Sequence, residues 1–277
     1  MCQLVLELKR PLSAPVYADV ISPNVLVVNS LEGIERLKLW EGNRQIDLCE
    51  IFTVRGETGG SVLEFCVTLS GDVGKVRRLG YQMKSGLLRI EGNVGMYVGE
   101  EMSGGSISVK GNAGSWLGSK MRGGTIEIYG DAADHVGAAY RGSRNGMKGG
   151  LIIVHGNAGD EAGCWMNNGI IQIDRKAGMF PGMHMRGGVV LIKGSCDGRA
   201  GAGMTGGRVI IRGRMENLLP SFTVEEIRER VRVGERRIEG PFYVFRGDMA
   251  CEGTGRIFVG VKRNTHLKWC EKYLETW

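Results

Sequence analysis

The feature that most constrains this chain is a glycine-rich unit that recurs seven times between residues 71 and 212. The third copy, GNAGSWLGSKMRGGTIEIY, begins at Gly111. Five copies are 19 residues long, whereas the first has two additional residues and the fourth has seven. Such a fixed period is typical of repeat architectures, in which each unit buries its apolar face against the next unit.

Each unit ends in a short stretch with apolar residues at every second position, as in Ile107 and Val109. This alternation predicts a half-buried strand, and the β-branched residues suit a pleated surface. A glycine pair precedes most of these stretches and predicts a sharp turn, because glycine accepts positive φ. Two residues before the pair stands a methionine in every unit: Met83, Met102, Met121, Met147, Met166, Met185 and Met204.

A period of 19 residues is too short for a strand, a helix and two loops. The leucine-rich-repeat signature and the calcium-binding nonapeptide are both absent. One coil of a β-solenoid fits, and seven coils stacked at about 4.8 Å extend roughly 34 Å. The sequence therefore predicts an all-β fold of about seven 19-residue coils, with a methionine ladder inside. It also predicts a polar row made of Asp72, Asn93, Asn112, Asp131 and Asn157.

The flanks of the repeat do not follow the pattern. Residues 1–70 are predicted to form an N-terminal cap, residues 71–212 the repeats, and residues 213–277 a C-terminal capping and partner-binding segment, all in one continuous domain. Caps are needed because the end coils of a solenoid expose unpaired backbone edges. Thr223-x-x-Glu226 has the form of a capping box and predicts a charged helix. Residues 240–262 are predicted as strands.

Two segments are candidates for contact with a partner. The insertion in the fourth unit carries Tyr140, Arg141, Arg144 and Asn145, and insertions in repeat proteins often lie on the binding face. A plain surface loop and a catalytic loop remain alternatives for it. At the end of the chain, Trp269, Tyr273 and Trp277 are either part of a closing cap or anchors on a partner.

The sequence offers no recognisable catalytic or metal site. None of the four histidines forms H-x-x-H or H-E-x-x-H, and G-x-S-x-G is absent. Asp134 and His135 are adjacent, so on a strand their side chains point to opposite faces. A carboxylate cleft of the kind that polysaccharide lyases use is also absent. We expect no catalytic, cofactor-binding or metal-binding residues in this chain.

The compartment and the class of partner can also be inferred. The seven cysteines include no C-x-x-C pair, which indicates reduced thiols in a cytoplasm, with Cys164 and Cys196 as small core residues. The N-terminus lacks the pattern of an export signal, and no apolar stretch approaches the roughly 20 residues that span a bilayer. The arginines between 228 and 237 alternate with glutamates and indicate a solvated face. We expect a cytoplasmic protein that binds neither nucleic acid nor a membrane.

The pattern G-x-x-G-x-x-x-G…M-x-G-G resembles the glycine-rich GXGXG repeat of the glutamate synthase C-terminal β-helix domain. Residues 92–142, with the insertion in the fourth unit, more closely resemble the C subunit of formylmethanofuran dehydrogenase. That resemblance extends over about residues 20–260. It departs where Arg175 replaces the leading glycine, where Asn167-Asn168-Gly169 replaces x-Gly-Gly, and after Lys262.

The resemblance implies a single-stranded right-handed parallel β-helix that serves as a non-catalytic scaffold. The family's complex is an oxidoreductase that reduces CO2 and attaches it to methanofuran during methanogenesis in archaea. Its other subunits would carry the cofactors: a tungsten- or molybdenum-pterin with [4Fe–4S] clusters, iron–sulfur subunits, and an amidohydrolase-like subunit with a binuclear metal site. The alternatives are the C subunit of a formyltransferase/hydrolase complex, or a stand-alone glutamate synthase-like β-helix subunit.

Overall fold

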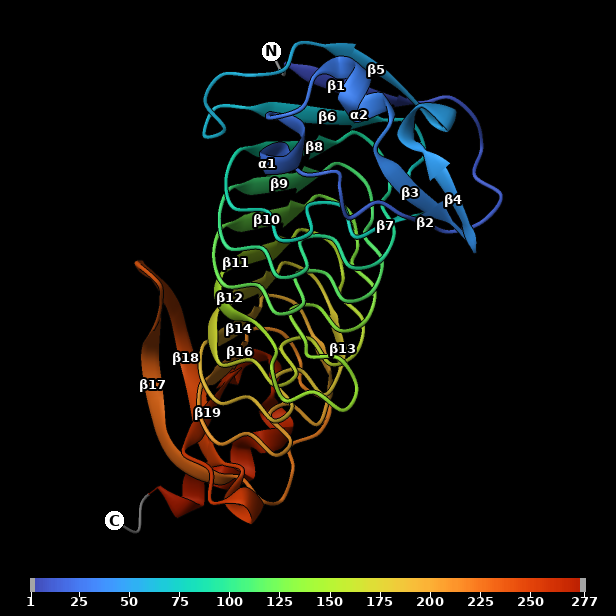
Figure 1. Ribbon diagram of the computed structural model, residues 1–277. Helices are drawn as coiled ribbons and strands as arrows, with labels where there is room; N and C mark the ends of the chain where they lie inside the picture. Colours follow the sequence, from blue (N-terminus) through green and yellow to red (C-terminus); the bar gives the residue numbers. More distant parts are fainter. Residues whose placement is uncertain (1–2, 275–277) are drawn as a thin grey trace.

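The computed structural model describes residues 3–274, which consist mostly of strands with few helices (Figure 1). Thirteen strands form one mixed sheet in the order β17-β18-β19-β16-β14-β12-β11-β10-β9-β8-β6-β1-β5. The prediction of an all-β fold is confirmed. None of the helices in the described part of the chain is long and apolar enough to cross a membrane.

The N-terminal segment closes one end of this sheet. Strand β1 (Leu4–Leu8) pairs in parallel with β6 (Cys66–Ser70) and antiparallel with the edge strand β5 (Phe52–Gly56). A second sheet has the order β4-β3-β2-β7. The remaining elements of this region are β2 (Val16–Tyr17), α1 (Pro23–Leu26), α2 (Leu31–Glu35), β3 (Lys38–Glu41), β4 (Arg44–Asp47), the 3-10 turn η1 (Leu48–Glu50) and β7 (Val76–Arg77).

In the central part, successive loops of the chain lie one above another, and each adds a parallel strand to the sheet (Figure 1). Equivalent residues of the units are opposite one another, as Ile107, Ile126 and Ile152 are. The seven extra residues of the fourth unit therefore lie outside the paired positions. These strands are β8 (Leu87–Ile90), β9 (Ser106–Val109), β10 (Thr125–Ile128), β11 (Lys148–Val154), β12 (Asn168–Ile173), β14 (Val189–Ile192) and β16 (Arg208–Ile211).

Both predicted ladders are confirmed. All seven repeat methionines are fully buried. In the polar row, the backbone N–H groups of Asn112 and Asp131 donate to the side-chain oxygens of Asn93 and Asn112 at 2.9 and 2.8 Å. Apart from the large sheet, a row of single-residue parallel bridges joins successive units from Val73 to Ala177. It continues in the two-stranded sheet of β13 (Ala177–Met179) and β15 (Cys196–Gly198). The hydrophobic core, which contains the seven methionines, lies between this row of bridges and the large sheet.

The predicted helix at Thr223 is wrong. Residues Thr223–Val233 form β17, which pairs antiparallel with β18 (Arg236–Gly247) in a long hairpin. The first three apolar residues of β17, Val224, Ile227 and Val231, are three and four positions apart, as in a helix. Register shifts next to Val224 and Arg228 instead accommodate this spacing within a strand. The predicted strands after residue 240 are confirmed as β18 and β19 (Gly255–Gly260).

The hairpin packs on the outer face of the sheet, beside β14, β16 and β19 (Figure 1). Leu191 and Ile210 face outward there and are buried against Val231 and Phe242 of the hairpin. The equivalent outward position on β9 is Ser108, which has no such cover. The remaining elements are short 3-10 helices: η2 (Met249–Cys251) between β18 and β19, followed after β19 by η3 (Val261–Arg263) and η4 (Thr265–Tyr273).

The expectation of uniformly reduced thiols is wrong at Cys66. Cys66, at the start of β6, is disulfide-bonded. Cys49, Cys164, Cys196, Cys251 and Cys270 are free, as expected. The spacing of the cysteines in the sequence gives no sign of a bond at Cys66.

Candidate interaction surfaces

Each unit turns through a residue that is not glycine yet has positive φ. For Tyr97, Trp116 and His135 the φ angles are 66°, 59° and 67°. The left-handed conformation costs an L-residue about 1–2 kcal/mol, so its recurrence at one place in every unit points to a purpose. We call this set the turn column: Arg78, Tyr97, Trp116, His135, Glu161, Phe180 and Arg199.

The aromatic members of the turn column stack along the molecule. Tyr97 and Trp116 have ring centroids 5.5 Å apart, and Trp116 and His135 are 4.5 Å apart. Stacking of this kind contributes about 0.5–1.5 kcal/mol beyond area burial, which offsets part of the backbone cost. His135 also lies 3.4 Å from the Glu161 carboxylate. It does not pair with Asp134, whose side chain instead accepts from the N–H of Asp160.

Tyr140, from the insertion, packs back onto this column. Its ring lies edge-on to Tyr97 at 5.7 Å, with the Lys120 ammonium 4.9 Å from the ring centroid. Its hydroxyl donates to Glu100, a carboxylate only 4% exposed that also binds Arg78 Nε at 2.9 Å. Burial and the bond to Glu100 raise the pKa of Tyr140. Tyr140 thus fastens the insertion to its own chain.

The other candidate residues of the insertion point toward solvent. Arg141, Arg144 and Asn145 are exposed. The Arg144 guanidinium lies 5.5 Å from the centroid of the Trp165 ring, which Arg186 approaches to 5.1 Å. The insertion is therefore a surface whose outer side is cationic.

At the far end of the molecule, Trp269 and Tyr273 are about half exposed and meet edge to face at 6.1 Å. They line a groove of about 600 Å³ together with Pro220, Phe222 and Val224. The structure brings these two candidates together on one apolar surface. Trp277 lies outside the described residues.

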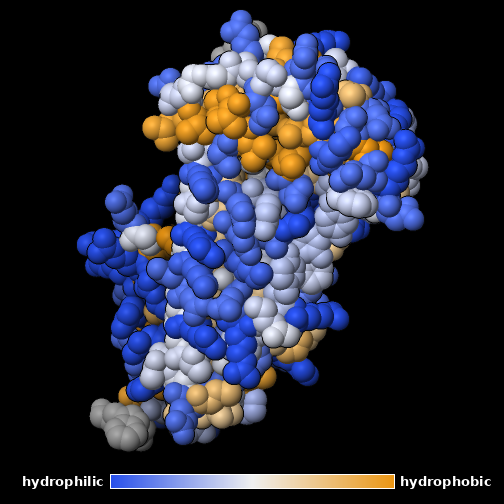
Figure 2. Space-filling view, in the orientation of Figure 1, coloured by the Kyte–Doolittle hydropathy of each residue, from blue (hydrophilic) through white to orange (hydrophobic). Residues whose placement is uncertain are grey.

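A second apolar surface lies on the N-terminal segment. Val28, Leu31 and Leu63 are exposed, and Figure 2 shows apolar surface gathered over the N-terminal end of the molecule. The central coils below it are mostly hydrophilic in the same view (Figure 2). Sequence reasoning missed this surface, because the segment has no repeat that would separate its outward residues from its core.

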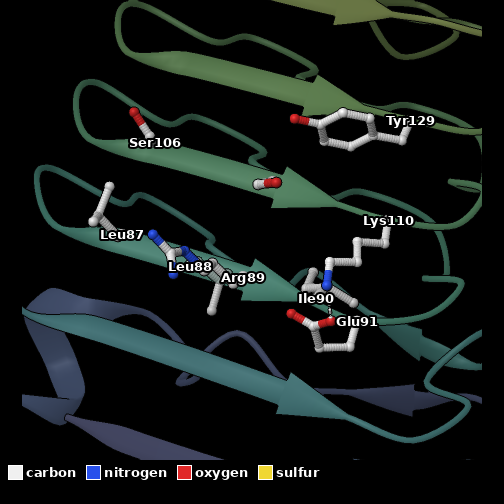
Figure 3. A pocket seen from close by; sticks show the side chains of 9 residues that line it. Leu87, Leu88, Arg89, Ile90, Glu91, Ser106, Lys110 and Tyr129 are labelled. Atoms are coloured by element: carbon white, nitrogen blue, oxygen red, sulfur yellow. Dashed lines mark ion pairs between the residues drawn. The ribbon is translucent and has the colours of Figure 1, made fainter. Parts of the chain in front are cut away.

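The part of the sheet that the β17–β18 hairpin does not cover carries a shallow groove of about 680 Å³ along β8 to β10 (Figure 3). Its lining includes Leu87 and Arg89 of β8, Ser106 and Ser108 of β9, and Tyr129, which directly follows β10. Lys110 and Glu91 pair across one end. The lining contains no arrangement of a nucleophile and a base.

Further along this face, His155 lies between two carboxylates. Its ring nitrogens are 2.8 Å from Glu127 and 2.9 Å from Asp174, which also binds Lys193 at 2.8 Å. The hydrogen bond to Glu127 is the largest cause that raises the pKa of His155. His155, Asp174 and Lys193 occupy equivalent positions of successive units, so aligning the units could have revealed this ladder.

Two of the buried thiols are poorly suited to nucleophilic chemistry. Burial raises the pKa of Cys164 to about 12 and that of Cys196 to about 11, whereas a reactive thiol needs a lowered pKa. Within residues 3–274, no group of three or more histidines, cysteines and carboxylates is placed to hold a metal ion.

A solved structure of a multi-subunit enzyme shares this fold over almost the whole chain. It is the formyltransferase/hydrolase complex (FhcABCD) from Methylorubrum extorquens in complex with methylofuran. The match has a TM-score of 0.83 and 29% sequence identity, and it covers 92% of this chain and 99% of that chain. The fold is thus similar to that of a chain from a formyl-transferring assembly.

Curated relatives are more specific in name but match a shorter region. The C subunit of the molybdenum-containing formylmethanofuran dehydrogenase 1 of Methanosarcina barkeri is 37% identical over 98 residues. That of the tungsten-containing formylmethanofuran dehydrogenase 2 of Methanothermobacter thermautotrophicus is 39% identical over 99 residues. These matches cover 35% and 36% of this chain, and 33% and 37% of the relatives, so they span about a third of each relative's length. No protein-family model matches the chain.

Proposed function

We propose that this chain is a scaffold subunit of a cytoplasmic formylmethanofuran dehydrogenase, the complex that reduces CO2 and attaches it to methanofuran. The observation that carries the proposal is the match of 92% of the chain, at a TM-score of 0.83, to a chain of a formyl-transferring complex. The 37–39% identity to the C subunits of formylmethanofuran dehydrogenases gives it the first place among the alternatives.

In this proposal the chain is a right-handed parallel β-helix of seven coils. Residues 71–212 form the coils, and residues 1–70 and 213–277 close the two ends. The in-register strands and the buried methionine ladder support a stiff rod, because the stacked backbones are bonded and the core is filled. A stiff rod can hold two catalytic subunits at a constant separation while a labile intermediate passes between them.

The chemistry is assigned to partner subunits. A metal-pterin subunit with tungsten or molybdenum, iron–sulfur subunits, and an amidohydrolase-like subunit with a binuclear metal site would carry it. The raised pKa values of Cys164 and Cys196 support this division, because cluster ligation requires thiolates.

A second candidate is the corresponding subunit of a formyltransferase/hydrolase complex without redox chemistry. The solved complex that matches this chain favours it, because that complex is itself a formyltransferase/hydrolase. The two candidates differ in the metals of the partners and not in the role of this chain.

The deciding experiment is an affinity purification of the tagged chain from its native host under anaerobic conditions, with metal analysis. We expect large subunits to co-elute with iron, zinc, and tungsten or molybdenum. Large partners that lack both pterin metals would favour the second candidate. Elution of the chain alone would contradict both.

A further inference from the structure

One row of exposed cations runs along the stacked units. Lys84, Arg122, Lys148 and Arg186 each follow the buried methionine of their unit, and we call them the cation row. Their backbones are in register: the N–H of Arg122 bonds Met102, that of Lys148 bonds Met121, and that of Arg186 bonds Met166. The cations therefore lie in one line and not at scattered points of the surface.

None of the four members of the cation row forms an ion pair within residues 3–274. Glu101, an acidic side chain on the neighbouring turn, is already bound by Lys120 and Gln82. By contrast, Lys110 and Lys193 on the sheet face each have a carboxylate partner. Besides the hydrogen bond from Gln82, Arg122 acts electrostatically on the Glu101 carboxylate and helps to lower its pKa, but the row has no ion pair of its own among the described residues.

A groove begins at the glycines that follow Lys148 and Arg186, and its lining also includes the side chains of Ile170, Val189, Arg208 and Arg256. It has a volume of about 630 Å³, and glycines that directly follow Lys148 and Arg186 pave it: Gly149, Gly150, Gly187 and Gly188. Added Cβ atoms at Gly149 and Gly187 would come within 2.4 and 2.2 Å of the preceding coil's carbonyl oxygens. Close stacking of the coils therefore requires glycine at these positions. As a consequence, this part of the groove carries no side chains.

We propose that the cation row and this groove bind an extended acidic peptide segment of a partner subunit. From Lys84 to Arg186 there are five steps of about 4.8 Å, or about 24 Å, the length of roughly seven residues of extended chain. Carboxylates along such a segment would pair with the row, and its backbone would lie on the glycine floor. Arg144, from the insertion, adds a further cation near the end at Arg186.

A peptide fits this surface better than a nucleic acid does. Proteins that bind single strands place free aromatic faces beside their cations, on which bases stack. The aromatic ring at this row is Trp165, and it is already stacked on His184 at 4.4 Å and contacted by Arg144 and Arg186. No free stacking platform accompanies the row among the described residues.

The inference rests on the proposed function only for the existence of a partner, so it is tested without one. The probe is a fluorescent peptide of alternating Glu and Ser, and its binding to the full-length chain is followed by anisotropy. We expect salt-sensitive binding that R122Q/K148Q/R186Q weakens by about tenfold, the combined effect of three exposed ion pairs. The matched control K262Q/R263Q/K268Q removes three exposed charges elsewhere and should leave binding unchanged.

Three outcomes would overturn the proposal: no binding of the acidic peptide, equal weakening by both triple variants, or tighter binding of a single-stranded oligonucleotide of the same charge. In the complex purified from the host, a zero-length carbodiimide cross-linker should join Lys84 or Lys148 to Asp or Glu of another subunit. Cross-links from Lys268 alone would also overturn it. Failure to recover any complex would count against the proposed function and leave the peptide result to decide this inference.

Discussion

At the residue scale, the repeated left-handed turn is the least expected feature of the chain. Trp116 and His135 adopt positive φ, a conformation in which glycine would be free of strain. Their two rings pack against each other. The preference of a single residue would not place a tryptophan there. The stabilisation comes from contacts with side chains 19 or 26 residues away, which only the stacking of units brings together.

His155 makes one residue-scale effect testable by pH. Its pKa is raised in the folded chain, so its contribution to stability is fully present below the unfolded value of about 6.5. That contribution is lost as the pH rises through the folded pKa. We expect the melting temperature of H155Q to fall below that of the wild type by more at about pH 5.5 than at about pH 9.

Thermal unfolding followed by circular dichroism across this pH range measures the effect. The exposed His266 provides the control, because H266Q should parallel the wild type. A gap between H155Q and wild type that stays constant with pH would show that the carboxylates do not act on a protonated imidazole.

At the element scale, the hairpin β17–β18 decides which outward positions of the sheet are apolar. Leu191 and Ile210 lie beneath it and are buried, whereas Ser108 and Glu127 occupy the equivalent positions in the uncovered coils. The sequence shows this change only in part, because Ile153 of β11 is apolar at the same position without belonging to the cluster beneath the hairpin. The meaning of the change depends on knowing that the charged segment after residue 222 folds back as strands.

This contrast predicts opposite tolerance at equivalent positions. L191S should lower the free energy of unfolding by about 2–5 kcal/mol, because it leaves a cavity and a polar group beneath the hairpin. The matched change S108L, on the uncovered face, should alter it by no more than about 0.5 kcal/mol. Urea unfolding at equilibrium compares the two. Similar costs for both substitutions would mean that the hairpin does not cover Leu191 in solution.

At the scale of the whole molecule, additional strands cover the edges of the parallel sheet at both ends of the stack. Strand β16 is paired on its outer side by β19, which β18 and then β17 continue. At the other end, β1 and β5 follow β6. Without these additions the parallel strands would present unpaired backbone groups to other molecules.

Truncation after Arg212 tests this role. The shortened chain would expose the edge of β16 and the outward faces of Leu191 and Ile210, so we expect it to aggregate. Size-exclusion chromatography of the soluble fraction would show the loss of the monomer peak relative to the full chain. A stable monomer of the truncated chain would mean that the coils need no closing segment at this end.

The sequence by itself determined the unit, its strands and the two ladders, because a residue repeated at one period must meet its own copies when the units stack. The fully buried methionines and the Asn93–Asn112 bond follow from this rule. The tertiary structure alone decided that Thr223–Val233 is a strand, that Tyr140 turns inward to Glu100, and that Arg144 approaches Trp165. Those outcomes depend on contacts between segments that do not share the repeat period. In such contacts, the burial of apolar surface and the pairing of a buried charge outweigh the local conformational propensity.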